Sequence, residues 1–389
     1  MMSHAWLLPE YFEDILPPYA RQVEGLRRRL MDLFEGWGYE PVCPPLMEYL
    51  ESLLTGAAQD LDLKTFKVVD GLSGRTLGVR ADITPQVARI DAHLLNRQGV
   101  TRLCYAGAVL HTRPAVLTHS RELLQLGAEL FGHAGIEADV EILDLLLAAL
   151  QATGLPDLRV SLGHVGIFQA LVGAAGLSEG LQQELFLALQ AKDIPALGRL
   201  TTGLAGGLAE SLCRLPELYG GPEVIAAARG ILPALPGITQ ALSDLEQLVQ
   251  TDRGINLLVD LADLRGYGYH NGAMFAAYAG GQAQAIALGG RYDGAGAIFG
   301  RARPATGFSL DLRRVVNGLT GPEPRHGILA PYGMDAALRA RVQALRASGE
   351  RVVTELPGQQ AHRAESGCDR ILVQEQGEWR IRPLGACRT

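Results

Sequence analysis

Lysine is scarce in this sequence, and acidic residues outnumber basic ones. The 389-residue chain has lysine only at positions 64, 67 and 192, and 42 Asp and Glu outweigh 35 Lys and Arg, for a formal net charge of −7. None of these lysines ends a glycine-rich loop, which excludes a P-loop nucleotide site. A broad nucleic-acid or membrane-binding surface would need a basic face, and the net charge argues against one.

Cysteines and long apolar runs are also few. The five cysteines never form a C-x-x-C pair, so we expect reduced thiols in a cytoplasmic protein. The most apolar stretch, about 142–155, contains Asp144 and is too short to span a bilayer, so it predicts a buried helix. Residues 1–6 lack a charged segment followed by an apolar core, so we expect no secretory signal.

The signatures of several enzyme classes are missing as well. The nine histidines form no H-E-x-x-H motif and none lies at ligand spacing from a cysteine, so we expect no metal and no other cofactor. Without a G-x-S-x-G elbow, a hydrolase would have no nucleophile. The glycine run 289–294 does not match G-x-G-x-x-G, so a tight turn is favoured over a phosphate-binding loop.

Hydrophobic periodicity divides the chain into two strand-rich halves around a helical middle. The length predicts two or three domains at ~100 to 200 residues each. Residues 168–248 show no strand alternation, so we expect an all-helical insertion there. Beyond a Gly-Pro-Glu-Pro linker at 321–324, strand and helix patterns predict a small α/β domain over 325–389. The expected helices of the larger part cover 19–34, 84–96, 136–152 and 310–319, and its expected strands cover 66–79 (a hairpin), 103–110, 122–130, 158–162, 256–261, 273–278 and 283–288.

Several polar residues stand in apolar strand contexts. Asp82 and Thr84 share one face, as do Gln125 and Glu129 on another strand. Such groups could hold an ammonium or an imidazole in a buried pocket, since each buried donor needs an acceptor. A satisfied structural network is the alternative, and spacing alone favours it. If the segment 265–271 is extended, three more polar residues share a side: Arg265, Tyr267 and Tyr269.

At these residues the chain resembles histidyl-tRNA synthetase, a class II aminoacyl-tRNA synthetase, over residues 9–320. The resemblance implies an α+β fold: a class II synthetase-like antiparallel sheet flanked by helices, in a core over 1–320 with a helical insertion at about 164–250. Any single match is weak, but five matches in order are specific. They are Asp14-Ile15-Leu16-Pro17 with the following helix and 38–48 (motif 1), Arg80-Ala81-Asp82-Ile83-Thr84, Arg113-Pro114 with Gln125-Leu126-Gly127-Ala128-Glu129 (motif 2 and the strand after it), 265–271, and 289–294 leading to 304–308 (motif 3).

The departures from the family pattern fall where the synthetases bind ATP. Motif 2 of the family reads Phe-Arg-x-Glu before Arg-Pro, and here Leu110 replaces the arginine and Thr112 the glutamate. Motif 3 of the family reads Gly-Leu-Glu-Arg, and here Asp311 replaces the glycine and Arg313 the glutamate. Losing one group that stabilises developing charge costs ~100- to 1000-fold in rate, so losing several predicts that no adenylate forms.

The positions that the resemblance assigns to the histidine pocket are altered less. His270 stands where the family has a second tyrosine, and Ala273 and Ala276 replace a threonine and a glutamate, so we expect weakened recognition of free histidine. The candidate pocket residues are Asp82, Thr84, Arg113, Gln125, Glu129, Arg265, Tyr269 and His270.

A synthetase-like core with an altered ATP site most resembles the regulatory subunits of ATP phosphoribosyltransferase, which are inactive synthetase paralogues. This implies a non-enzymatic subunit that activates the short-form catalytic subunit in the first step of histidine biosynthesis and relays feedback inhibition by histidine. It also implies a homodimeric core within a hetero-octamer. The C-terminal segment is too short for the anticodon-binding domain of the synthetases, so we expect no nucleic-acid partner. A divergent active synthetase and a synthetase-like binding protein unrelated to histidine synthesis are the alternatives.

Overall fold

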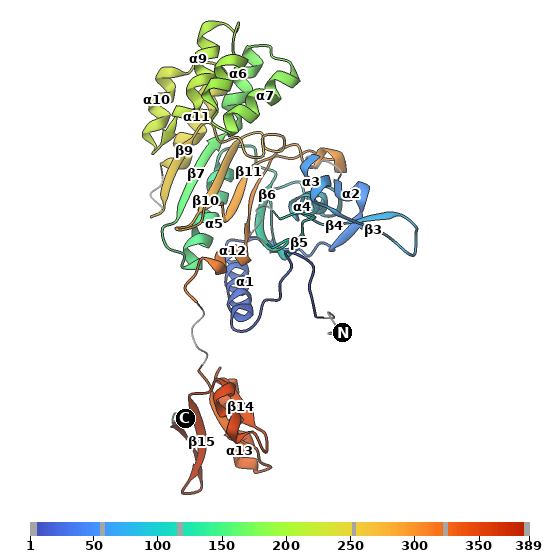
Figure 1. The fold of residues 1–389 in the computed structure, drawn as a ribbon, viewed down its shortest axis with the longest axis vertical. Helices are drawn as coiled ribbons and strands as arrows, with labels where there is room; N and C mark the ends of the chain where they lie inside the picture. The colour runs from blue at the N-terminus through green and yellow to red at the C-terminus, as the bar shows by residue number, and fades with distance from the viewer. Residues whose placement is uncertain (1–5, 55–58, 115–119, 251–253, 322–325, 385–389) are drawn as a thin grey trace. The chain divides into compact units, whose positions relative to one another are not determined.

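A computed structural model describes residues 6–54, 59–114, 120–250, 254–321 and 326–384. The chain divides into two compact units, residues 1–320 and 321–389 (Figure 1). Within the described ranges, no helix is both long enough and apolar enough to cross a membrane.

The larger unit is built on a nine-stranded sheet with the order β1-β5-β6-β12-β11-β10-β7-β9-β8 (Figure 1). Its centre is antiparallel, but β1 runs parallel to β5, and β7 runs parallel to β9. The sheet is therefore mixed toward its edges. The strands are β1 (Glu40–Pro41), β5 (Thr101–Leu110), β6 (Glu122–Phe131), β7 (Arg159–His164), β8 (Tyr219–Gly220), β9 (Asn256–Asp260), β10 (Ala273–Tyr278), β11 (Ala287–Arg291) and β12 (Ala305–Asp311).

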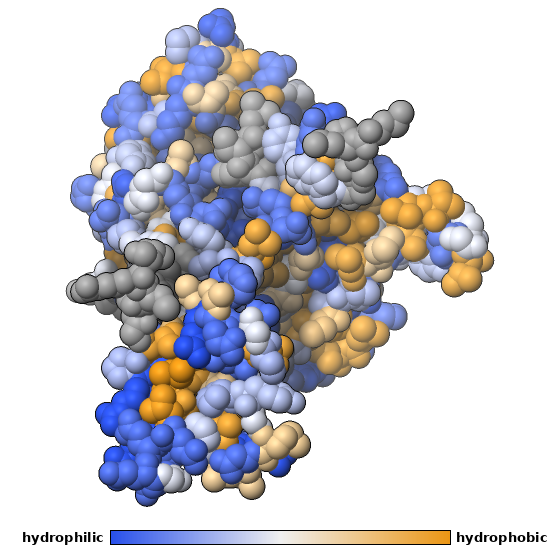
Figure 2. All heavy atoms as spheres, turned by 60° about the horizontal axis from the view of Figure 1, so that its bottom comes forward, coloured by the Kyte–Doolittle hydropathy of each residue, from blue (hydrophilic) through white to orange (hydrophobic). Residues whose placement is uncertain are grey.

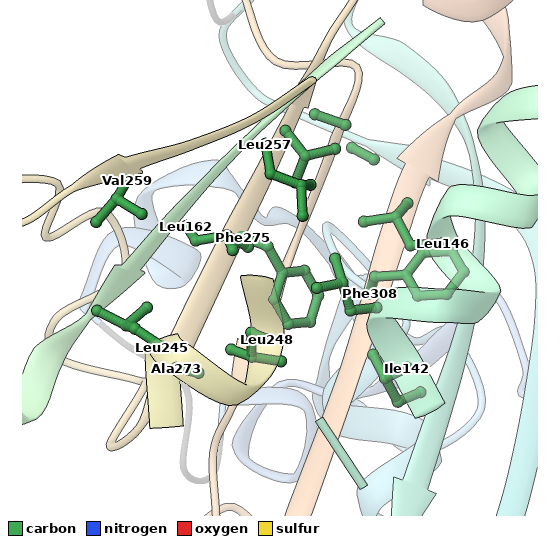
Figure 3. Close-up of a cluster of buried hydrophobic side chains, with 14 of the residues drawn as sticks. Ile142, Leu146, Leu162, Leu245, Leu248, Leu257, Val259, Ala273, Phe275 and Phe308 are labelled. Atoms are coloured by element: carbon green, nitrogen blue, oxygen red, sulfur yellow. The ribbon is translucent and has the colours of Figure 1, made fainter. Parts of the chain in front are cut away.

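Helices α1 (Tyr19–Gly36), α5 (Glu137–Thr153) and α12 (Leu312–Asn317) pack on strands β5, β6 and β12 of this sheet and bury much of the main core. Ile142 and Leu146, one turn apart on α5, lie beside Phe308 of β12 (Figure 3). Phe308 also packs edge-on against Phe34 of α1, with ring centroids 5.7 Å apart. Gly154 ends α5 with φ 77°, a left-handed conformation that glycine adopts without steric cost.

The insertion lies between β7 and β9 and is helical except for β8, which pairs with β9. The expectation of an all-helical insertion is wrong at this pair. Ser178 and Asp193 start two of its helices by accepting backbone N–H groups with their side chains. Leu245 and Leu248 of its last helix pack in the main core (Figure 3). The helices are α6 (Val165–Ala174), α7 (Glu179–Gln190), α8 (Ile194–Leu200), α9 (Gly206–Arg214), the short η2 (Leu215–Glu217), α10 (Glu223–Ile231) and α11 (Pro236–Val249).

A small sheet of order β2-β4-β3 stands beside the main one. The expected hairpin is confirmed as β3 and β4, and Figure 2 shows apolar side chains on the projection that it forms. Val68, Val69 and Leu72 are exposed there. The helix expected over 84–96 consists of α4 (Thr84–Arg89), which continues as the π-helical η1 (Ile90–Leu95). The other elements here are β2 (Met47–Tyr49), α2 (Leu50–Leu54), α3 (Gln59–Lys64), β3 (Phe66–Val69) and β4 (Thr76–Val79).

Two elements of the larger unit begin at residues other than those predicted from the sequence. The strand expected at 283–288 is β11, which begins at Ala287 and includes Gly289 and Gly290. Gly289 pairs with Phe275 on the neighbouring strand, and glycine is needed there because a side chain would collide with the Phe275 ring. The helix expected from residue 310 begins at 312, since β12 extends through Asp311. The segment between β11 and β12 contains the short η3 (Ala297–Phe299).

The smaller unit is a four-stranded sheet of order β14-β13-β15-β16 with one long helix. Asp335 starts that helix by accepting the N–H groups of Ala337 and Leu338. Leu338 packs in a separate core with Ile328 and Leu372. The elements are β13 (Ile328–Pro331), α13 (Ala336–Ala347), β14 (Val352–Glu355), η4 (Gln360–Ser366), β15 (Arg370–Glu375) and β16 (Glu378–Pro383).

Candidate functional site

A polar cluster is built on β6, where Gln125 and Glu129 face the same side of the sheet. Because side chains alternate along a strand, Gly127 lies between them on that face. β12 runs antiparallel beside β6 and places Gly307 opposite Glu129. A side chain at Gly307 would collide with the Glu129 carboxyl, so glycine there leaves the space that this carboxyl occupies.

Glu129 is almost completely buried, and its carboxyl accepts hydrogen bonds from two tyrosine hydroxyls. Tyr105 of β5 donates to one oxygen at 3.0 Å, and Tyr292, which follows β11, donates to the other. Burial raises the pKa of Glu129 to about 8, although the two hydroxyls act to lower it. At neutral pH this group is therefore largely protonated, a neutral hydrogen-bonding group rather than a fixed charge.

Asp82 and Gln125 form the other half of the cluster. Gln125 donates from Nε2 to Asp82 Oδ1 at 2.8 Å, and the backbone N–H of Thr84 donates to the same oxygen at 3.0 Å. The Thr84 hydroxyl lies 3.1 Å from the Tyr105 hydroxyl, which in turn bonds Glu129. The charge of Asp82 also raises the pKa of Glu129. The structure therefore joins these four predicted residues in one hydrogen-bonded network.

Tyr269 and His270 border this network. The Tyr269 ring stacks on Tyr292 with centroids 5.0 Å apart, and its buried hydroxyl has no hydrogen-bond partner among the described residues. His270 Nδ1 lies 3.2 Å from the carbonyl oxygen of Arg291. A carbonyl only accepts, so Nδ1 carries the proton. Burial lowers the pKa of His270 to about 4, and its imidazole is neutral at neutral pH.

The segment forms turns over 265–269, so the condition under which Arg265, Tyr267 and Tyr269 would share a side is not met. Tyr267 points into the insertion, where its ring contacts Phe168 and Phe186 at centroid distances of 5.2 and 5.3 Å. Tertiary packing decided this direction, because the insertion supplies an apolar partner for Tyr267 that strand periodicity cannot reveal.

Two of the predicted pocket residues do not contact the cluster. Arg265 donates from Nε to Asp263 at 2.8 Å and from Nη1 to the Tyr278 hydroxyl. The Asp263 carboxylate raises the pKa of the Arg265 guanidinium above its ordinary value. Arg113 is exposed and stands just before 115–119, which lie outside the described residues. Their membership of a ligand pocket stays a prediction.

A cavity of about 270 Å³ adjoins the cluster along Asp82 and Gln125. Apolar side chains form much of its wall, and Asp311 and Arg314 lie together in it with Oδ2 and Nε 3.4 Å apart. Burial raises the pKa of Asp311. The cavity also has Lys64 and His111 in its lining, and burial lowers the pKa of His111.

The other departures from the synthetase pattern lie outside this cavity. Arg313 donates from Nη2 to Glu122 at 2.8 Å, and Thr112 donates its hydroxyl to the carbonyl of Leu63. Leu110, at the end of β5, contributes no charge. Positive charge at the cavity therefore comes from Lys64 and Arg314.

Sequence reasoning missed the two tyrosines that bind Glu129 and the cations in the cavity wall. Tyr105 is opposite Gly127 in the β5–β6 register, a cross-strand relation that periodicity within one strand does not show. Tyr292 was part of the motif 3 match, but its reach to Glu129 depends on the turn after β11. Among the described residues, no group of three or more His, Cys, Asp or Glu side chains is placed to hold a metal ion.

Comparison with known proteins identifies relatives for both units. The family model for histidyl-tRNA synthetase matches residues 11–315, and the model for the C-terminal domain of ATP phosphoribosyltransferase subunit HisZ matches residues 325–382. The ATP phosphoribosyltransferase regulatory subunit of Ralstonia pickettii is 56% identical over 99% of this chain and 100% of the relative. That of Cupriavidus necator is 56% identical over 98% of this chain and 100% of the relative.

Solved structures agree with this assignment. A crystal structure of an ATP phosphoribosyltransferase regulatory subunit/histidyl-tRNA synthetase from Bacillus halodurans is 27% identical, with TM-score 0.84, covering 95% of this chain and 98% of that one. Histidyl-tRNA synthetase from Nostoc is 18% identical with TM-score 0.77 over 97% of both chains, which shows the shared fold. The expected class II synthetase-like α+β fold is thus confirmed. The chain belongs to the family of ATP phosphoribosyltransferase regulatory subunits, non-catalytic proteins with the fold of histidyl-tRNA synthetase.

Proposed function

We propose that this chain binds and activates the short-form catalytic subunit of ATP phosphoribosyltransferase, and that its polar cluster binds free histidine as the feedback signal. Similarity to regulatory subunits over nearly the whole chain supports the first part. The hydrogen-bonded network around Glu129 supports the second. The assembly that we propose is a homodimer of this chain within a cytoplasmic hetero-octamer, without a nucleic-acid partner.

The cluster offers complementary groups for both ends of a histidine molecule. A neutral imidazole has one N–H donor and one nitrogen acceptor. Glu129 and the Tyr269 hydroxyl are neutral groups that can each donate or accept a hydrogen bond, so they can bind both imidazole nitrogens. An α-ammonium is a strong donor, and the Asp82 carboxylate beside Gln125 and Thr84 is its natural acceptor. The buried Tyr269 hydroxyl, which has no partner within the described part of the chain, is the observation that carries this assignment, because such a group costs free energy until a ligand bonds it.

Activation is tested by mixing the purified chain with the short-form catalytic subunit and measuring phosphoribosyl transfer to ATP. We expect turnover to rise on mixing, and a light-scattering mass to show one complex that contains both chains. No stimulation and no complex would contradict the proposal. Robust histidine-dependent exchange of pyrophosphate into ATP by this chain alone would indicate an active synthetase instead.

Histidine binding is tested by calorimetric titration of the chain alone and then of the complex. Glu129→Ala removes the carboxyl and the hydrogen bond that it offers a ligand, so histidine affinity should fall about 5- to 160-fold, as expected for a buried hydrogen bond worth about 1 to 3 kcal/mol. Glu141→Ala is the matched control, because Glu141 also accepts a tyrosine hydroxyl, that of Tyr39 at 2.9 Å, outside the cluster. Equal histidine affinity in the wild type and Glu129→Ala would place the effector site elsewhere.

Feedback requires that histidine distinguishes two states of the assembly, since a ligand that binds both equally shifts neither. We therefore expect histidine to change the affinity between the subunits or the turnover of the complex. In Glu129→Ala the catalytic subunit should still be activated, but inhibition should need a higher histidine concentration.

A further inference from the structure

The cavity beside the polar cluster balances its charges internally. Lys64 and Arg314 bring two positive charges to its lining, and Asp82 and Asp311 bring two negative ones. Asp82 already accepts hydrogen bonds from Gln125 and from the backbone of Thr84. Asp311 is the carboxylate that lies against Arg314, with Oδ2 3.4 Å from Nε.

Arg314 is held at two points. Its Nε faces Asp311, and its Nη1 donates to the carbonyl oxygen of Ala285 at 3.1 Å. Asp311 itself is fixed, because its Oδ1 accepts the N–H of Arg313 at 3.1 Å and so starts α12. This carboxylate therefore stays beside the arginine through its role as a helix cap.

A phosphate-bearing molecule needs an uncompensated cation, and charge-assisted contacts from arginine are the strongest that a protein offers it. At about 270 Å³ the cavity has room for several water-sized groups, so its volume does not exclude a phosphate. The charge of the Asp311 carboxylate does exclude a phosphate, because like charges at contact distance in a partly buried site repel strongly.

We propose that Asp311 is a specificity-determining residue, which neutralises Arg314 and excludes phosphate-bearing ligands from the cavity, so that the site responds to a compact amino acid. This rests on the proposed function, in which a ligand reaches Asp82 and Gln125. A regulator that works beside an ATP-consuming enzyme would then ignore the nucleotide and report the amino acid alone.

Asp311→Asn tests the proposal by a gain of binding. Asparagine is also a good helix cap, so the variant keeps the bond to the Arg313 N–H while it removes the charge. Inorganic pyrophosphate and ATP are titrated separately into the full-length wild type and variant by calorimetry. We expect pyrophosphate affinity to rise at least tenfold in Asp311→Asn, and a matching rise for ATP shows that the cavity also admits a nucleotide.

Asp70→Asn is the matched control, because the Asp70 side chain bonds within its own turn and lies outside the cavity lining, yet its loss changes net charge equally. Its pyrophosphate affinity should stay within about threefold of the wild type. In the double variant Asp311→Asn with Arg314→Gln, the gained affinity should disappear, which identifies Arg314 as the anion partner.

Unchanged pyrophosphate affinity in Asp311→Asn, or a rise no larger than that of Asp70→Asn, overturns the proposal, provided circular dichroism shows that the variant is folded. If Asp311→Asn does not fold, Asp311→Ser keeps a capping hydroxyl and serves the same test. Histidine titration of the wild type in parallel separates this result from a failure of the proposed function, because anion binding needs neither histidine nor the catalytic subunit.

Discussion

Replacing Glu129 by glutamine should stabilise the larger unit, and more so as pH rises. Burial raises the pKa of Glu129 from 4.5 to about 8, so the folded chain binds more protons than the unfolded chain between these values. Stability contributed by this group is complete below about pH 4.5 and is lost as pH rises toward 8. Glutamine has nearly the same shape and no proton to lose, so this pH dependence should vanish in the variant.

The magnitude follows from the size of the shift. At about 1.4 kcal/mol per pH unit, a difference of roughly 3.5 units corresponds to about 5 kcal/mol in full, of which about 3 kcal/mol is already lost at pH 7. Hydrogen bonds from Tyr105 and Tyr292 persist in either protonation state, so they do not cancel the trend.

Urea unfolding of the wild type and of Glu129→Gln at several pH values between about 5 and 8 measures the difference. Comparing the two proteins at each pH removes the titration of every other group. The free energy of unfolding of the variant should exceed that of the wild type by an amount that grows by about 2 kcal/mol between pH 5 and 7. A difference that does not change with pH would refute the buried, proton-binding role of Glu129.

Three further predictions concern stability, each measured by urea unfolding of the purified variant. Phe308→Ala should cost about 3 to 5 kcal/mol in the larger unit, because it empties the space between α1 and α5; a cost below about 1 kcal/mol would contradict this packing. Asp91→Ala leaves the buried Arg303 guanidinium without its carboxylate, so a loss of about 3 to 5 kcal/mol is expected, and a neutral effect would argue against the pair. Leu372→Ala should destabilise the smaller unit by about 2 to 5 kcal/mol and leave the transition of the larger unit in place; a shift of both transitions would show that the units unfold together.

Elements with a strong period were predictable from the chain alone. The periodic apolar residues that begin at Tyr19 predicted α1, and alternation around Gln125 and Glu129 placed both side chains on one face of β6. The wrongly predicted boundaries lie where a glycine is compatible with both a loop and a strand, or where a helix-capping residue also ends a strand. Gly289 and Gly290 suggested a loop but belong to β11, where small residues permit close packing of neighbouring strands.

Part of the candidate site could also be predicted, because ordered motifs named Asp82, Thr84, Gln125 and Glu129 before any contact was known. The structure joins these four through hydrogen bonds. It turns Arg265 toward Asp263, which no spacing rule could foresee, because the two residues meet through a turn rather than along a strand.

The sequence by itself determined the strand-rich halves, the helical middle and the acidic balance. Each of these depends on residue type or on a period along one segment. Tertiary structure decided which groups meet: Tyr105 and Tyr292 on Glu129, Tyr267 in the insertion, and Asp311 against Arg314. The reason is physical, since the charge state of a buried group depends on neighbours brought together by strand register and turns, and these are distant along the chain.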